Sequence, residues 1–188
     1  WCDAAGSEAA RMSALSINEV LPVSQSVVTS VQPGTLYVVA TPIGNLSDIS
    51  ERALNTLAEV DLIAAEDTRI TRKLLGTFSI DTPTTSLHQH TSCTKEQTLV
   101  RELANGTSIA VVSDAGTPGI SDPGSRFIAM AVHHGIEVVP IAGPSAVATA
   151  LSICGFPTNR FTFVGFPPSK KGRTKFFNEV NISTQNVL

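Results

Sequence analysis

Four short segments of this 188-residue chain are rich in Gly, Pro or acidic residues in a way that suits ligand binding: residues 41–48, 66–69, 113–124 and 142–146. Each follows a short apolar run that is typical of a buried strand. Glycine lets the backbone approach a ligand closely, and proline stiffens a loop without leaving an N–H group to satisfy. A tight turn explains any one segment, but four of them together favour a binding site.

The segment at residues 113–124 is the most unusual, because it holds two carboxylates in a frame of glycine and proline. Asp114 and Asp122 could bind a metal, orient a ribose or accept a proton. A helix begins nearby, so Asp122 could equally serve as its N-cap. The turn at Gly143 also opens a helix, whose free N–H groups suit a carboxylate or a phosphate, although Gly-Pro is a common helix entry as well.

Two further groups of side chains are weaker candidates. His88 and His90 share a face if that segment is extended, but a metal site needs a further ligand at closer motif spacing. We therefore expect no metal there, and prefer hydrogen bonding near a cleft or a surface role. Near the C-terminal end, four of the 13 basic residues fall within six positions, which fits either a solvated linker or phosphate contacts: Lys170, Lys171, Arg173 and Lys175.

The elements that must position these segments alternate along the chain. Apolar runs predict strands at residues 36–40, 62–65, 84–87, 109–112, 136–139 and 161–164. The run at residues 109–112 has no polar residue, as a central parallel strand requires. The alternation of strands with helices predicts an α/β domain on a largely parallel sheet, with helices on both faces. In such sheets ligands bind at the carboxyl ends of the strands, which is where the four segments fall.

Helix boundaries follow from capping residues. Ser47 or Asp48 is expected to cap the helix after the first strand, and the pair at residues 105–106, Asn-Gly, to close the helix at residues 95–104. In that last helix, the buried face is expected to consist of Leu99, Val100 and Leu103.

The composition and the net charge exclude several classes of protein. Hydrophobic residues make up 42% and charged residues 15%, which allows a real core and argues against a disordered chain. The net charge of −3 argues against a surface that is basic all over. Nothing resembles a signal peptide or an apolar stretch of about 18 residues. The three cysteines, odd in number and without zinc-type spacing, suggest reduced thiols in a cytoplasmic protein.

The segments read together resemble the rRNA small-subunit methyltransferase I family of the tetrapyrrole-methylase superfamily. The motifs that carry the resemblance are LYVVATPIGNL at residues 36–46, AAEDTR at 64–69, SDAGTPGISDPG at 113–124, VVPIAGPSA at 138–146 and GFPPSK at 165–170. They occur in the family's order and cover roughly residues 34–180. Family members usually have proline where this chain has Ala142, which should loosen that turn slightly.

This resemblance implies a two-domain α/β enzyme, usually a homodimer, that binds S-adenosylmethionine in the cleft between its domains. It implies 2′-O-methylation of a cytidine in the decoding region of 16S rRNA within the small ribosomal subunit. The residues that it assigns to the cofactor are Pro42, Gly44, Asn45, Asp114, Ala115, Gly116, Thr117, Ile120, Gly143, Pro144, Ser145 and Ala146. Glu66, Asp67 and Arg69 would lie at the cleft mouth toward the RNA, and Lys170, Lys171 and Arg173 would bind substrate.

A ribose hydroxyl is a weak acid, so a carboxylate that takes its proton would help the reaction. Asp114 is our first candidate for that base and Asp67 is the second, because both lie at strand ends.

We expect a flexible leader over residues 1–33, a cofactor-binding methylase domain over 34–166, and a linker with the start of a truncated second domain over 167–188. Half of the cleft would then be missing from this chain. Two alternatives stay open: a tetrapyrrole C-methyltransferase, and an inactive truncated remnant. The reading frame downstream of Leu188 separates enzyme from remnant.

Overall fold

The computed structural model describes residues 30–122, 124–181 and 186–187, so most of the expected leader lies outside the described residues. Five strands form one sheet in the order β3-β2-β4-β1-β5, and all four neighbouring pairs run parallel. The strands are β1 (Thr35–Val39), β2 (Leu62–Ala65), β3 (Thr84–Ser86), β4 (Ile109–Val112) and β5 (Glu137–Ile141). The expectation of a parallel α/β sheet is confirmed, with boundaries that move by one or two residues.

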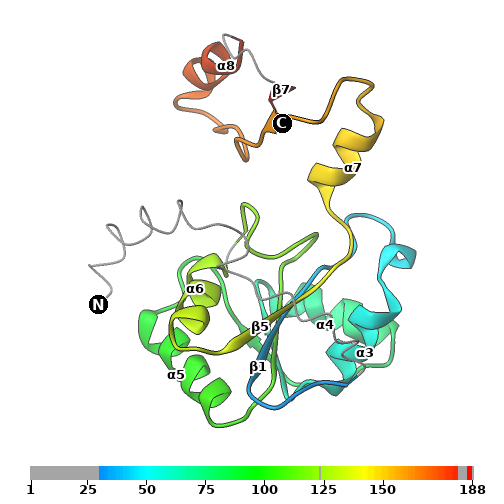
Figure 1. Cartoon of the computed structure of the whole chain (residues 1–188), viewed down its shortest axis with the longest axis vertical. Coiled ribbons are helices and arrows are strands. Elements are labelled where there is room, and N and C mark those ends of the chain that lie inside the picture. The colour runs from blue at the N-terminus through cyan, green and yellow to red at the C-terminus, as the bar shows by residue number, and fades with distance from the viewer. Residues whose placement is uncertain (1–29, 123, 182–185, 188) are drawn as a thin grey trace.

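Helices cover both faces of this sheet, as Figure 1 shows. They are α3 (Glu51–Glu59), α4 (Thr68–Thr77), α5 (Cys93–Ala104) and α6 (Ser125–His133). Side chains alternate along a strand, so one strand serves two cores. In β4, Ala110 and Val112 pack with α3 and α4, whereas Ile109 and Val111 pack with α5 and α6. This double burial explains why the strand is apolar throughout.

The expected inward side of α5 is also confirmed, because Leu99, Val100 and Leu103 are all buried. The helix ends with Asn105 as its C-cap, and the next residue, Gly106, has φ +99°. A positive φ of this kind is the conformation that glycine adopts without strain.

The N-caps differ from the expectation at two helices. After β1 the chain first makes a 3-10 turn, η1 (Leu46–Asp48), capped by Asn45, and Ser50 then caps α3. The prediction of Ser47 or Asp48 as the cap was wrong, because both residues lie within that extra turn. At α6 the N-cap is Gly124, and it makes no side-chain cap hydrogen bond. Asp122 is therefore not the N-cap of α6.

Beyond β5 the chain leaves the sheet. Helix α7 (Ala146–Ile153) leads in Figure 1 to a separate group that holds β6 (Phe161–Thr162), α8 (Arg173–Asn181) and β7 (Asn186–Val187). The strand expected at residues 161–164 is shorter and pairs in parallel with β7, outside the main sheet. Ile153 and Phe166 are each 82% exposed. The domain boundary at residue 166 stays a prediction.

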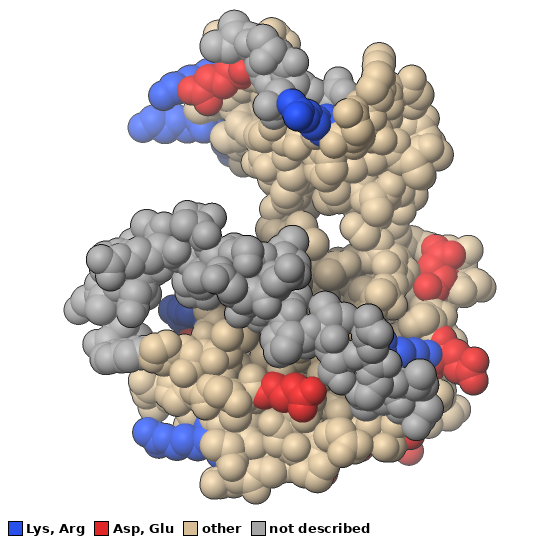
Figure 2. Space-filling model, in the orientation of Figure 1, with Lys and Arg blue, Asp and Glu red and all other residues tan. Residues whose placement is uncertain are grey.

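The face shown in Figure 2 is not basic all over. On the face shown in Figure 2, the largest group of basic side chains lies on the upper part that holds α8, next to acidic ones. Among the described residues, no helix has the length and apolar character needed to cross a membrane.

The cysteines do not all match the expectation of reduced thiols. Cys154 is a free, exposed thiol, but Cys93 is disulfide-bonded. Whether a cysteine pairs depends on which Cβ atoms the fold brings within about 4 Å, and cysteine count and spacing do not contain that information.

Candidate functional site

The site lies where the direction of the chain changes between two neighbouring strands. β1 and β4 are adjacent, but the chain leaves β1 toward β2 through α3 and leaves β4 toward β5 through α6. These two helices cover opposite faces of the sheet, so the chain runs to opposite sides beyond the two loops, and open α/β sheets bind ligands in the crevice at the carboxyl ends of the strands at such a point.

Backbone hydrogen bonds join the loops that follow β1 and β4. The Thr41 amide donates to the Gly116 carbonyl at 2.9 Å, and the Gly116 amide returns a bond to the Thr41 carbonyl at 3.0 Å. The Thr41 hydroxyl also donates to the Ser113 carbonyl at 3.2 Å, in a buried position. Gly116 makes this short antiparallel bridge with φ +82°, a conformation that glycine adopts without strain. Two of the predicted cofactor loops are therefore held in one unit.

A cluster of carboxylates joins the ends of β2 and β4. The Asp67 amide donates to Oδ1 of Asp114 at 3.0 Å, and the Asp114 amide donates to Oε2 of Glu66 at 3.3 Å. The carboxylates of Asp114 and Glu66 thus each accept a hydrogen bond from the backbone at the end of the other strand. The structure brings together the three acids that the motifs singled out.

Burial and mutual repulsion shift the protonation of this cluster. Burial raises the pKa of Glu66; the hydrogen bond from the Asp114 amide opposes this, and the charge of Asp114 adds to it. Burial likewise raises the pKa of Asp122, against a hydrogen bond with Ser113, and Asp114 again adds to the rise. Carboxylates with raised pKa values in a crevice are common where proton transfer or cation binding takes place.

Asp67 behaves in the opposite way because Arg69 neutralises it. The Arg69 side chain donates from Nε and Nη2 to the Asp67 carboxylate, with a shortest distance of 2.6 Å. These bonds and the Arg69 amide lower the pKa of Asp67 to about 2. The Arg69 side chain is 85% exposed, so this pair lies at the mouth of the crevice. Asp67 also caps α4 through the same amide of Arg69.

The turn after β5 packs closely against β1. A Cβ added to Gly143 would lie 3.0 Å from the Cβ of Ala40, which is tighter than nine in ten real Cβ contacts. The Thr117 hydroxyl donates to the Pro144 carbonyl at 3.3 Å, and Ser145 caps α7. The third predicted cofactor loop therefore contacts the second. Ala115, Ile120 and Gly143 stay exposed on these loops.

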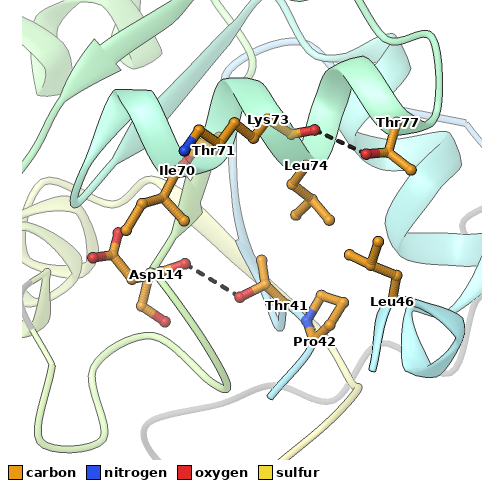
Figure 3. A pocket seen from close by; sticks show the side chains of 10 residues that line it. Thr41, Pro42, Leu46, Ile70, Thr71, Lys73, Leu74, Thr77 and Asp114 are labelled. Atoms are coloured by element: carbon orange, nitrogen blue, oxygen red, sulfur yellow. Dashed lines mark hydrogen bonds between the residues drawn. The ribbon is translucent and has the colours of Figure 1, made fainter. Parts of the chain in front are cut away.

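A pocket of about 250 Å³ opens beside these loops, between η1 and α4 (Figure 3). It is lined by Thr41, Pro42, Leu46, Ile70, Thr71, Lys73, Leu74, Thr77, Ser113 and Asp114. In Figure 3, Ile70 and Leu74 point from α4 into the pocket, whereas Asp114 and Leu46 lie at its two ends.

The predicted site residues separate into three groups. Pro42 and Asp114 line the pocket, and the other residues of the cofactor loops lie on the loops around it. The basic residues predicted to bind substrate, Lys170, Lys171 and Arg173, do not line the pocket and lie with α8 in the upper part of Figure 1. Their roles stay predictions.

The sequence reasoning missed the face of α4 that the pocket uses. Ile70, Lys73, Leu74 and Thr77 follow a helical spacing of three and four residues, and this spacing was a usable signal. An amphipathic helix is expected to turn its apolar side to the core, but part of that side of α4 lines the pocket.

The histidines do not lie at the pocket. The His90 amide donates to Nδ1 of His88 at 3.2 Å, and both side chains lie in the loop before α5. Among the described residues, no group of three or more His, Cys, Asp or Glu side chains is placed to hold a metal ion.

Comparison with known proteins now gives the family. A family model described as Tetrapyrrole (Corrin/Porphyrin) Methylases matches residues 35–177. The chain belongs to the tetrapyrrole methylase family. The match includes all five strands of the parallel sheet and the loops that form the site.

Several curated relatives within this family are called ribosomal RNA small subunit methyltransferase I. The relative from Vibrio cholerae is 55% identical over 140 residues, which are 74% of this chain and 49% of that protein. The relative from Escherichia coli O157:H7 is 53% identical over 156 residues, 82% of this chain and 54% of that protein. The chain thus spans about half the length of the curated relatives it matches, and the resemblance carried by its motifs is confirmed.

A solved structure agrees with the fold. The uroporphyrin-III-C-methyltransferase from Thermus thermophilus superimposes with a TM-score of 0.51 at 18% sequence identity. The similarity covers 69% of this chain and 58% of that one.

Proposed function

We propose that this chain provides the cofactor-binding half of a methyltransferase that uses S-adenosylmethionine to methylate a cytidine 2′-hydroxyl in the decoding region of 16S rRNA. The observation that carries the proposal is the identity of 50–55% to relatives called ribosomal RNA small subunit methyltransferase I. That identity extends over the loops at the strand ends. We further propose a homodimer in the cytoplasm as the working form.

The residues at the crevice fit the proposed cofactor. Gly143 lets this turn pack closely against Ala40 at the end of β1, where a Cβ would lie 3.0 Å from the Ala40 Cβ, and this packing holds the turn beside the crevice. Asp114 offers a carboxylate that can accept hydrogen bonds from hydroxyl or amino groups. Ala115 and Gly143 expose backbone groups on two neighbouring loops. We assign the binding to the loops at residues 42–45, 114–120 and 143–146.

The chain's own residues would then serve to orient the substrate and remove a proton. S-adenosylmethionine supplies an electrophilic methyl group when bound. Oδ1 of Asp114 accepts the Asp67 amide, which holds the carboxylate in one orientation and leaves Oδ2 for the ribose hydroxyl. A general base of this kind contributes roughly 10²–10⁴-fold to a rate. Alignment of the two reactants supplies more, on the order of 7–11 kcal/mol.

Contacts to RNA would come from the cations at the surface. Arg69 is held by Asp67 and stays 85% exposed, so its remaining N–H groups can reach a phosphate. Lys170, Lys171 and Arg173 form the second basic group, and we propose that they contact the RNA backbone.

Two alternatives can be compared with this proposal. The likeness to a uroporphyrin-III-C-methyltransferase concerns the fold alone, so it does not favour a tetrapyrrole substrate over RNA. An inactive remnant would require that no second half follows in the reading frame.

The deciding experiment uses the protein expressed from its complete reading frame, with methyl-labelled S-adenosylmethionine. Small ribosomal subunits, large ribosomal subunits and a porphyrin precursor are offered in separate reactions. We expect label only in the rRNA of the small subunit, at one cytidine whose 3′ linkage becomes resistant to alkali. Label in the porphyrin precursor and none in rRNA contradicts the proposal. A failure to label any substrate supports the remnant.

A further inference from the structure

The pocket between η1 and α4 is largely apolar beside the charged cluster. Pro42, Leu46, Ile70 and Leu74 supply its walls, and Asp114 closes one end. Leu46 is 49% exposed and Ile70 is 44% exposed, although both are large hydrophobic side chains. Exposed apolar side chains around a cavity favour a ligand with an apolar face, because binding removes them from water.

The volume of the pocket indicates the kind of ligand. About 250 Å³ is less than the roughly 300–1,000 Å³ of pockets for drug-sized molecules, so it suits a single planar heterocycle. Enzymes that act on a base hold it, out of its stack, between aromatic or apolar side chains, and proteins that read single-stranded RNA also bind unstacked bases in this way. Leu46 on η1 and Leu74 on α4 come from two different elements and can contact two faces of such a ring.

Polar groups at the pocket match the edge of a pyrimidine. The Lys73 ammonium only donates hydrogen bonds, and in Figure 3 its side chain runs along α4 toward the end where Ile70 lies. The Thr77 hydroxyl already donates to the Lys73 carbonyl at 3.0 Å, so its oxygen can only accept a further bond. A donor and an acceptor at one pocket suit a base that carries both a carbonyl oxygen and an amino group; among the pyrimidines of RNA, cytosine carries both and uracil has no amino group.

We propose that this pocket receives the base of the nucleotide that is methylated. Leu46 and Leu74 contact its faces, and Lys73 donates a hydrogen bond to its edge. Asp114 lines the same pocket, so a base held there keeps its own ribose next to the carboxylate that we assign as the general base. The inference rests on the proposed function and adds to it the residues that select the nucleotide.

The test compares Leu46→Ala and Lys73→Met in the protein expressed from its complete reading frame. For both variants we expect the KM for small ribosomal subunits to rise about fivefold to tenfold, because a base contact is lost. The dissociation constant of S-adenosylmethionine should not change. Matched controls are Ile153→Ala, an exposed apolar side chain on α7, and Arg101→Met, a basic side chain on α5; both should behave like the unchanged protein.

A second measurement separates base binding from a structural effect. Small subunits are reconstituted with guanosine in place of the target cytidine, because a purine is larger than the single-ring base that the pocket is proposed to hold. We expect the unchanged protein to reject this substrate, and Leu46→Ala, which enlarges the pocket, to reject it less.

Three outcomes overturn the proposal or its basis, and they are distinct. Unchanged KM values in both variants, with normal rRNA labelling by the unchanged protein, overturn the base pocket alone. Weaker S-adenosylmethionine binding with an unchanged KM for subunits shows that the pocket belongs to the cofactor. Absence of rRNA labelling by the unchanged protein overturns the proposed function and the base pocket with it.

Discussion

The Asp67 amide donates a 3.0 Å hydrogen bond to the carboxylate of Asp114, 47 residues further along the chain. This bond ties the end of β2 to the end of β4 and orients a side chain that lines the pocket. Because the amide uses only one carboxylate oxygen, the other remains available. The relationship makes Asp114 the residue whose replacement is most informative.

Asp114→Asn should lower turnover at least about tenfold, since the amide can still accept the bond from Asp67 but is a poor base. The measurement is the single-turnover rate of rRNA methylation at saturating cofactor. Asp81→Asn, an exposed acid before β3, is the matched control and should have normal turnover. Normal turnover in Asp114→Asn would remove this residue as the base.

Glu66→Gln should make the protein more stable at neutral pH. Burial raises the pKa of Glu66 in the folded state, so the folded protein binds this proton more tightly than the unfolded chain. Stability is therefore lost as the pH rises from the ordinary value of 4.5 through the raised pKa, and glutamine removes this loss.

Urea unfolding midpoints between about pH 4 and 8 test this sign. The advantage of Glu66→Gln should be small at the acidic end and grow with pH to a plateau. Glu137→Gln, on an exposed position of β5, is the control for a lost carboxylate. A constant difference at every pH would show that burial of Glu66 is not the cause.

Gly143→Ala should destabilise the fold by about 1–3 kcal/mol, because its Cβ would lie 3.0 Å from the Cβ of the buried Ala40. Gly76→Ala in α4 is the control, since a Cβ meets nothing within 4 Å there. In a helix this change should be neutral or stabilising by up to about 1 kcal/mol. The measurement is the thermal unfolding midpoint of both variants. Equal midpoints would contradict the close contact between position 143 and Ala40.

Arg126→Met should destabilise the protein by about 1–3 kcal/mol. The Arg126 side chain donates to Glu96 at 2.7 Å and to the Thr91 carbonyl at 2.6 Å, and the Glu96 side chain is only 4% exposed. Loss of the cation leaves a buried carboxylate without its ion pair. Glu96→Met combined with Arg126→Met should recover most of the loss, and a double-mutant cycle of unfolding free energies measures the coupling. Additive effects would mean that the pair contributes little.

Much of the fold and part of the site could be predicted from the sequence. The apolar run of β4, the inward residues of α5 and the helices on both faces follow from periodicity, which depends on local geometry alone. Parallel strands place their carboxyl ends at one edge, so the four special segments were expected to lie near one another. The motifs within them also predicted the family.

Only the tertiary structure decided which of these segments touch. The strand order β3-β2-β4-β1-β5 puts β4 between β2 and β1, and this order creates both the Asp67–Asp114 bond and the Thr41–Gly116 bridge. It also turns Lys73 and Leu74 of α4 toward a pocket instead of the core. Periodicity determines what each element is, but neighbours far apart in sequence are chosen by packing and by backbone hydrogen bonds between strands, and no local pattern contains that choice.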